Sequence, residues 1–483
     1  MKDLKSTWML PFYKITKASY LLLSSLFSFC GHAVAQENDT ATLYYYWVTF
    51  TDKADSPYSI DDPAAFLSPR AIERREKQGI PITEQDIPVN PAYLAAIRNS
   101  GIQILHRSKW FNAATVICSK KEEKILEKLP FVKEAQYVGR VLGTKSGPPK
   151  FKMDSLLSKP VEGKPYGHGQ AQVELLKGER LHQLGYRGKG IYVGVLDGGF
   201  TGVDVSPFFD SLRQSERLLF PRDFVDADDF PYESSSHGTK VLSTMAANVP
   251  EVFVGTAPLA TYVVIKTEDT RSEQRIEECN WVAGLEYADS LGLDIVNSSL
   301  GYTTFDDRTM DYEYSDLNGK VSVASQAADI AFEKGMIVVT SAGNEGSSKW
   351  KYIGIPADSE KAFSIGATNI NGTKAGFSSF GPSADGRVKP DVAAPGSWVT
   401  VADAVSFRIS TGSGTSFASP IACGLVACLW EAFPDMNNQE ILDAIRQSSH
   451  QYEQPDYELG YGIPDFEKAY QLLQAKKELR QRP

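Results

Sequence analysis

The chain has 483 residues, too many for one ordinary domain, and 42% of them are hydrophobic, which is normal for a globular protein with a large buried core. Its formal net charge of -10 argues against a nucleic-acid partner, because phosphate binding needs clustered Lys and Arg. The 5 cysteines are too few and too scattered for a disulfide scaffold. Outside the amino terminus they are expected to be small buried apolar residues, at Cys118, Cys279, Cys423 and Cys428.

The amino terminus predicts a signal peptide over residues 1–35. Four lysines precede an apolar run at residues 20–29, and Ala33-Val34-Ala35 forms a small-residue cleavage site. The run is shorter than the roughly 20 residues of a membrane helix. Cys30 would suit lipid attachment, but the bulky Phe29 before it does not suit a lipoprotein signal. We therefore expect export to the periplasm or out of the cell. No later stretch is expected to span a membrane.

Residues 36–145 predict a small α+β domain, because strand and helix patterns alternate over about 100 residues. Strands are expected at 43–50, 102–105, 113–118 and 135–141, and helices at 63–78, 91–100 and 121–129. In the first helix, Arg70, Arg74 and Lys77 are expected to face water. Residues 146–169 are rich in Gly, Pro, Lys and Ser, which predicts an exposed linker.

From residue 170 to residue 483 short apolar strands are separated by helices. Strands are expected at 191–196, 261–266, 294–298, 336–341 and 363–367, and helices at 276–291, 322–334 and 465–481. This pattern predicts an α/β fold with a doubly wound, mostly parallel sheet that is covered on both faces.

Functional groups in such a sheet gather at the carboxyl ends of the strands. Asp197 directly follows the first of these strands. His237 opens a helix-like stretch, and Ser416 stands immediately before an apolar helix in which Pro420 is expected to occupy the first turn.

These residue types belong together chemically. A serine hydroxyl becomes a good nucleophile when a neutral imidazole takes its proton, and a carboxylate on the other ring nitrogen fixes the tautomer. Peptide hydrolysis also needs a donor for the tetrahedral oxyanion, and Asn344, after another strand end, supplies an exposed amide. Each feature alone is weak, and their joint occurrence carries the interpretation.

A nucleotide-binding α/β protein is another interpretation of this sheet, and the glycine spacing argues against it. Several glycines surround the first large-domain strand, which suggests a nucleotide-binding loop: Gly188, Gly190, Gly194, Gly198 and Gly199. They do not follow a strand in the Gly-x-Gly-x-x-Gly order that cradles a pyrophosphate.

The order of Asp197, then His237 before Gly-Thr, then Gly-Thr-Ser416-x-Ala-x-Pro resembles the subtilisin-like serine peptidases. The resemblance covers about residues 170–469. It includes the stretches Asn297-Ser298-Ser299-Leu300-Gly301, Ser341-Ala342-Gly343-Asn344 and Pro390-Asp391-Val392-Ala393-Ala394-Pro395-Gly396. In detail the chain is most similar to exported subtilases of Bacteroidetes-type bacteria. The resemblance implies a secreted, self-processing serine endopeptidase that acts on proteins or peptides.

The resemblance also implies substrate-binding residues. Ser299, Leu300 and Gly301 would form a strand that pairs with the substrate backbone. The pocket for the residue before the scissile bond would be walled by Ser341, Ala342, Gly343 and Gly354. None of these is acidic, so a large neutral or apolar side chain is expected there.

The small domain resembles the family's propeptide, which is both a folding chaperone and an inhibitor of its own enzyme. Cleavage is then expected within residues 143–167. A permanent accessory domain is the alternative, because nothing in the linker fixes a cut site.

Two positions depart from the family pattern. Asp197 is followed by Gly198-Gly199, where the family has Ser or Thr before Gly. Phe417 replaces the usual Met after the serine, so its ring should pack behind the nucleophile, and the activity should resist peroxide there. Neither departure removes a catalytic group. A catalytically inactive, peptide-binding relative is the rival interpretation, and the intact Asp, His, Ser and Asn argue against it.

No cofactor is expected for catalysis. An acidic stretch could hold a structural calcium ion, and it comprises Asp306, Asp307, Asp311, Glu313, Asp316 and Asn318. The EF-hand order is absent and a solvated acidic loop explains the stretch equally well, so no metal ligand is assigned.

Overall fold

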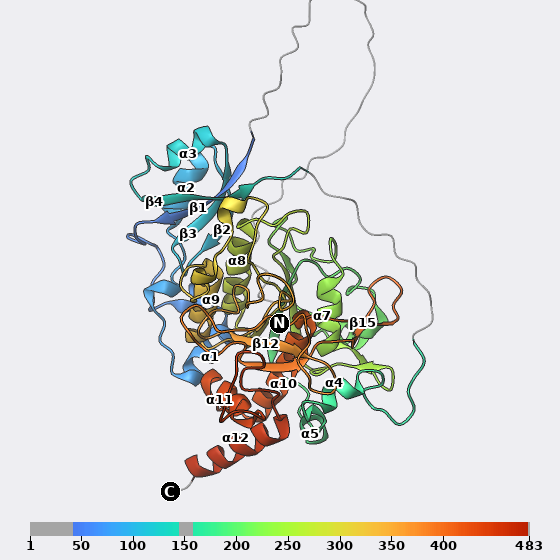
Figure 1. Ribbon diagram of the computed structural model, residues 1–483. Coiled ribbons are helices and arrows are strands. Elements are labelled where there is room, and N and C mark those ends of the chain that lie inside the picture. The colour runs from blue at the N-terminus through green and yellow to red at the C-terminus, as the bar shows by residue number, and fades with distance from the viewer. Residues whose placement is uncertain (1–41, 144–157, 482–483) are drawn as a thin grey trace, which may run out of the picture. The chain divides into compact units, whose positions relative to one another are not determined.

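Two main β-sheets organise the chain (Figure 1). The computed structural model describes residues 42–143 and 158–481. The expected signal peptide and the first part of the expected linker therefore lie outside the described residues. The described residues from Thr42 onward belong to one compact unit that contains both sheets.

The smaller sheet is antiparallel, with the strand order β2 (Gln103–Ser108), β3 (Ala113–Cys118), β1 (Tyr44–Phe50), β4 (Val132–Arg140). Side chains alternate across it, as the pleat requires. Tyr46, Val48 and Phe50 pack in one cluster with residues of α2 (Pro91–Asn99) and α3 (Lys120–Leu126). Trp47 points the other way, into the cluster that contains α8 (Ile276–Leu291).

The helix expected at residues 63–78 is two helices, η2 (Pro63–Ala65) and α1 (Pro69–Gln78). The hydroxyl of Ser68 accepts a hydrogen bond from the N–H of Ala71 and so starts α1. The expected water-facing position of Arg74 is wrong. Arg74 is 5% exposed, and its guanidinium pairs with Asp289 of α8. Helical periodicity could not reveal this, because the partner belongs to another element.

The larger sheet has seven parallel strands in the order β13-β12-β11-β10-β5-β9-β6, which confirms the doubly wound α/β class. In chain order the strands are β5 (Tyr192–Asp197), β6 (Arg222–Asp223), β9 (Thr261–Lys266), β10 (Ile295–Ser298), β11 (Ile337–Ser341), β12 (Phe363–Thr368) and β13 (Val392–Pro395). The sequence did not predict β6 and β13.

Helices cover both faces of this sheet. Val193 and Val195 of β5 pack in the cluster that contains α7 (His237–Ala246) and α10 (Thr415–Ala432). Leu196 of the same strand packs in the cluster that contains α8 and α9 (Val323–Glu333). Both faces are buried, which explains why the strands are almost continuously apolar.

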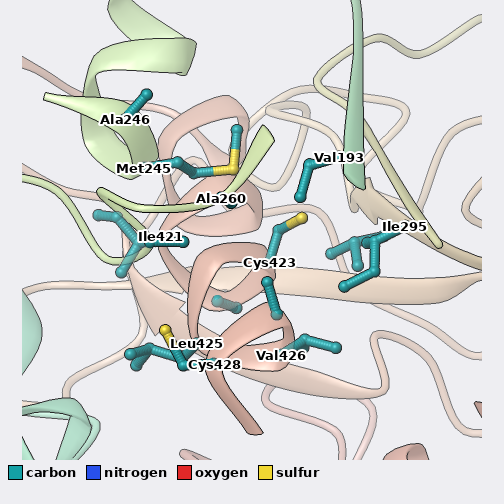
Figure 2. Close-up of a cluster of buried hydrophobic side chains, with 14 of the residues drawn as sticks. Val193, Met245, Ala246, Ala260, Ile295, Ile421, Cys423, Leu425, Val426 and Cys428 are labelled. Atoms are coloured by element: carbon teal, nitrogen blue, oxygen red, sulfur yellow. The ribbon is translucent and has the colours of Figure 1, made fainter. Parts of the chain in front are cut away.

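α10 is the central helix of the core. Figure 2 shows its Ile421, Cys423 and Val426 among side chains that include Val193 of β5 and Ile295 of β10. Among the described residues, one helix is long and apolar enough to cross a membrane by length and composition alone. Thr415–Ala432 has 18 residues and a mean hydropathy of 1.3. However, 94% of the helix is buried inside the protein, so its apolar surface is already used.

Short elements complete the structure. In the smaller domain and before β5 they are η3 (Glu84–Asp86), α4 (Gln170–Glu174) and α5 (Gly178–Gln183). Between β5 and β9 they are η4 (Pro207–Phe209), α6 (Asp210–Gln214), β7 (Asn248–Val249) and β8 (Phe253–Val254). The remainder are η5 (Arg308–Met310), η6 (Tyr314–Asp316), β14 (Val399–Ala402), β15 (Ile409–Gly412), α11 (Asn438–Ser448) and α12 (Phe466–Arg480).

His182 is buried, with 4% exposed, and its ring nitrogens bond to the hydroxyl of Tyr166 and to the carbonyl of Thr256. Tyr166 is likewise buried, so the end of the expected linker packs on the fold. The four cysteines of the described residues are free and buried, as predicted.

Candidate active site

Asp197 and His237 meet at the carboxyl edge of the large sheet. Asp197 is the last residue of β5 and is fully buried, and His237 begins α7. The imidazole Nδ1 lies 2.9 Å from each carboxylate oxygen of Asp197. The negative charge of Asp197 raises the pKa of His237 above its usual 6.5. This hydrogen bond leaves Nε2 as the free ring nitrogen.

Gly199, near Asp197, and Gly238, after His237, permit a close approach of chain segments. A Cβ atom on Gly199 would lie 2.1 Å from the carbonyl oxygen of Glu233. A Cβ atom on Gly238 would lie 2.6 Å from the carbonyl oxygen of Gly199. The N–H of Gly198 donates to the carboxylate of Asp197 at 2.8 Å. The unusual Gly-Gly pair therefore fits this turn, and the carboxylate takes its bond from the backbone.

Ser416 lies inside the first turn of α10 rather than before it, and it is 8% exposed. Its hydroxyl donates to the carbonyl of Ser299 at 3.3 Å. Within residues 42–143 and 158–481, no hydrogen bond joins this hydroxyl to His237. The next residue, Phe417, places its ring against the imidazole, with 5.7 Å between centroids. Phe417, which follows the serine in the sequence, thus contacts the histidine.

Pro420 lies in the second turn of α10, not in the first as the sequence analysis expected. Proline has no N–H, so the carbonyl of Ser416, four residues earlier, loses its helical partner. The hydroxyl of Ser299 takes that place and donates to this carbonyl at 2.9 Å. The side chain of Asn297 in turn donates to the Ser299 hydroxyl at 3.0 Å. The sequence did not predict this series of hydrogen bonds, although a proline four residues after the serine indicates that the serine carbonyl needs another partner.

Asn344 is exposed, and α10 fixes the orientation of its side chain. Its Oδ1 accepts hydrogen bonds from the N–H of Thr415 at 2.8 Å and from the Thr415 hydroxyl at 3.0 Å. The amide NH₂ is therefore turned away from Thr415. The hydroxyl oxygen of Thr415 also accepts from the N–H of Gly343 at 3.2 Å, so the loop after β11 is tied to the start of α10.

The expected substrate-binding residues come together from three segments. Tyr302 and Ile355 exchange backbone hydrogen bonds of 2.9 and 3.1 Å, and the N–H of Gly354 donates to the carbonyl of Ala342 at 3.1 Å. Residues 299–301, 341–343 and 354 are thereby brought side by side. Several of their side chains are buried, namely Ser299, Ser341 and Ala342. Gly301 has open space, since a Cβ atom there would meet nothing closer than 3.6 Å.

A cavity of about 460 Å³ lies beside the Asp197–His237 pair. Its wall includes Leu300, Glu268 and Glu273 of the loop after β9, and Glu277 in the first turn of α8. Burial raises the pKa of Glu268 to about 8 and that of Glu273 to about 7. The sequence did not predict this pocket, because its carboxylates are spread over a loop and the start of a helix.

The acidic residues 306–318 serve local turns. Asp307 accepts from the N–H of Thr309, and Asp311 accepts from the N–H of Phe305. Among the residues that the structure describes, one trio of carboxylates converges closely enough for a metal ion, namely Asp223, Asp226 and Glu233. The ammonium group of Lys266 already pairs with Asp223 at 2.8 Å and with Asp226 at 3.0 Å. The trio therefore has a cation of its own.

The parallel α/β fold and the family comparison place the chain in the class of serine endopeptidases. The chain belongs to the subtilase family: residues 188–462 match the model described as Peptidase S8, subtilase family. Residues 45–152 match the Peptidase S8 propeptide domain of Bacteroidota, so the predicted resemblance to Bacteroidetes-type subtilases is confirmed. The chain is therefore a serine peptidase with a propeptide domain.

Curated relatives support the same assignment. Subtilisin NAT of Bacillus subtilis subsp. natto is 28% identical over 380 residues, which cover 78% of this chain and 85% of the relative. Subtilisin DY of Bacillus licheniformis is 29% identical over 311 residues, which cover 64% and 98%. Thermitase of Thermoactinomyces vulgaris is 32% identical over 212 residues, which cover 43% and 65%.

Proposed function

We propose that Asp197, His237 and Ser416 form the catalytic triad of this peptidase and that Asn344 is its side-chain oxyanion donor. The hydrogen bond from His237 to the buried Asp197 carries the proposal, because it leaves Nε2 as a base on the side of α10. The hydroxyl of Ser416, now 3.3 Å from the Ser299 carbonyl, would rotate toward Nε2 when substrate binds. Catalytic hydrogen bonds are often long before substrate is present.

The reaction follows from these positions. Nε2 of His237 takes the proton of Ser416 while Oγ attacks the peptide carbonyl, and the charged imidazole is stabilised by Asp197. The oxyanion accepts hydrogen bonds from the amide NH₂ of Asn344 and from the backbone N–H of Ser416. This N–H has no helical partner because it belongs to the first turn of α10. His237 then gives its proton to the leaving amine, and water releases the acyl group by the reverse sequence.

Substrate binding uses the segments that converge on Ser416. The backbone of residues 299–301 would pair with an extended substrate, as an added strand does. Ser341, Ala342, Gly343 and Gly354 would wall the pocket for the residue before the scissile bond. We expect a large neutral or apolar side chain there, because none of these four residues is charged.

The precursor would be divided as the sequence suggests. Residues 1–35 act as an export signal, 36–145 as the propeptide, 146–169 as the linker that is cut, and 170–483 as the peptidase. The extensive packing of the small domain on α8 supports an inhibitor that must be removed. Catalysis needs no cofactor in this scheme, and calcium, if bound, would be structural.

Fluorophosphonate labelling of the purified precursor tests the proposal. The precursor should be labelled and should lose its amino-terminal domain with time. Ser416→Ala should do neither. Ser413→Ala is the matched control, because Ser413 is exposed and three residues away, and it should behave like the unaltered chain. Labelling and processing that persist in Ser416→Ala would overturn the triad. An unaltered chain that is never labelled would favour the inactive, peptide-binding alternative.

A further inference from the structure

The backbone of Lys266 lies beside Asp197. Lys266 is the last residue of β9 and is 1% exposed. It stands opposite Asp197 in the parallel register of β5 and β9. The N–H of the next residue, Thr267, donates to the carbonyl of Asp197 at 3.1 Å. The sheet therefore fixes Lys266 next to the residue whose carboxylate orients His237.

The side chain of Lys266 pairs with a different segment of the chain. Its ammonium group lies 2.8 Å from a carboxylate oxygen of Asp223 and 3.0 Å from one of Asp226. Asp223 ends β6, a two-residue strand at the edge of the sheet, and is fully buried. Because so short a strand has few backbone hydrogen bonds, the buried ion pair is an important contact between β6 and β9.

The two aspartates begin the segment that leads to His237. Residues 224–236 connect β6 to α7 through turns and loop, with no helix between them. The carboxylate of Asp223 accepts hydrogen bonds from the N–H of Val225 at 2.8 Å and from the N–H of Asp226 at 2.9 Å. Since no helix or long strand holds this segment, its conformation depends on contacts of this kind.

A third carboxylate brings the far end of the segment to the same place. Carboxylate oxygens of Glu233 and of the two aspartates lie within 4.8 Å of one another. The carbonyl of Glu233 accepts from the N–H of Ser235 at 2.9 Å, and the hydroxyl of Ser235 accepts from the N–H of His237 at 3.0 Å. Negative charges this close repel one another unless a cation offsets them. The buried ammonium group of Lys266 is such a cation.

The ammonium group of Lys266 stays charged at neutral pH. Burial acts to lower its pKa, but the hydrogen bonds and the negative charges of Asp223 and Asp226 outweigh burial and raise the pKa above the usual 10.5. Carboxylate oxygens are also the ligands that Ca²⁺ prefers. An ammonium group and a calcium ion are therefore alternative occupants of the place among these carboxylates.

We propose that Lys266 is a positioning residue, an internal cation that holds residues 223–236 in the conformation that brings His237 to its carboxylate partner. The inference rests on the proposed catalytic site and adds to it a residue that acts through His237 without touching substrate. Two consequences follow. Loss of the ammonium group displaces His237, and it leaves a group of carboxylates that a divalent cation can join instead.

The first test measures kcat and KM of mature Lys266→Met, which keeps a side chain of similar length without its charge. In the presence of a chelator its kcat should be about 10- to 100-fold lower, because a small displacement of a catalytic group costs this much. KM should change little, since residues 299–301 are untouched. Added calcium should restore most of kcat. The unaltered enzyme in the same buffers is the reference for any other effect of calcium.

The second test is calorimetry, which measures calcium binding without relying on activity. It uses the Ser416→Ala precursor, which should not process itself. Lys266→Met in this precursor should bind one calcium ion more than the precursor with Lys266, and Glu233→Gln should remove that additional ion. Lys389→Met is the matched control, because Lys389 is also buried and pairs with Asp391 at 2.9 Å. It should add no calcium ion and give no calcium-dependent kcat.

The outcomes are distinct. An unchanged kcat in Lys266→Met, a loss that calcium does not restore, or the same calcium response in Lys389→Met would each overturn the inference while the triad stands. If Lys266→Met does not fold even with calcium, Asp226→Asn decides, because it removes only the more exposed of the two ion pairs. Its kcat should fall severalfold at constant KM, and an unchanged kcat would overturn the inference. If the unaltered chain takes no fluorophosphonate, the proposed function fails and the positioning role falls with it.

Discussion

At the residue scale, the proposed chemistry depends on how His237 is charged. Its Nδ1 donates to Asp197, so the imidazolium form is stabilised by a buried carboxylate. The pKa is therefore raised, mainly by the charge of Asp197 and against the effect of burial. A general base must be neutral before it can accept a proton, so the same contact that orients the ring also sets the acid limit of activity.

We predict that kcat/KM falls as the pH is lowered through a midpoint above 6.5, because the raised pKa keeps His237 protonated to a higher pH. Asp197→Asn should move the midpoint to lower pH and reduce kcat by about 10⁴-fold, because the amide stabilises the wrong tautomer. Rates with a neutral peptide between pH 5 and 9 measure both effects. An unmoved midpoint in the variant would contradict the assigned pair.

Asn344 offers a second test at this scale. Thr415 holds its Oδ1, so the NH₂ has a fixed direction before substrate arrives. Asn344→Ala should lower kcat by about 10²- to 10³-fold with little change in KM, since the donor acts on the transition state. Steady-state kinetics measure this split. A rise in KM alone would assign Asn344 to ground-state binding instead.

At the element scale, α10 combines two tasks. Its apolar residues fill the centre of the core, while its first turn presents Ser416 at the sheet edge. Pro420 removes one bond of the helix, and the hydroxyl of Ser299 replaces it. The segment that would pair with substrate is thus joined directly to the backbone of the nucleophile.

We predict that Ser299→Ala destabilises the protein by about 1–3 kcal/mol, because the buried carbonyl of Ser416 loses its partner. The activity should fall as well, since the first turn of α10 is less firmly held. Thr309→Ala, which removes an exposed hydroxyl far from α10, is the control and should have little effect. Denaturant unfolding and kcat measurements test this prediction. Equal free energies of unfolding in both variants would show that Ser299 does not support the helix.

At the scale of the whole molecule, a buried ionic cluster joins the two sheets. Asp289 of α8 pairs with Arg74 and Arg75 of α1 and with Lys109, which follows β2. Burial alone would raise the pKa of Asp289, but Lys109 and the two arginines outweigh it and hold that pKa below its usual range. The cluster is therefore charged at neutral pH.

We predict that Asp289→Ala, made in the Ser416→Ala precursor, destabilises that precursor by about 3–5 kcal/mol, because it leaves buried cations unpaired. Glu73→Ala breaks an exposed pair with Lys77 and should change nothing measurable. The contribution of Asp289 should be full above about pH 4 and be lost only as the pH falls through its depressed pKa. Unfolding curves at pH 7 and pH 3 measure the free energy of unfolding of each variant. An equal loss of that free energy in Asp289→Ala and Glu73→Ala would contradict the prediction.

Sequence patterns alone predict the parallel α/β class, most strands of both sheets, and Asp197, His237, Ser416 and Asn344 as candidates. These features follow from local patterns: apolar runs, helix starts and short motifs at strand ends. The position of one charged residue was predicted wrongly. Arg74 is buried because its partner, Asp289, comes from a distant segment, which periodicity along one helix cannot register.

How the candidate residues meet depends on the folding of the whole chain. It brought His237 to Asp197 across 40 positions of the chain, joined Ser299 to the Ser416 carbonyl that Pro420 had freed, and enclosed the glutamates after β9 in one cavity. The physical reason is that hydrogen bonds and charge interactions depend on distance in space. Short motifs specify which groups are present, and packing of the sheet against α7, α8 and α10 specifies which of them can act together.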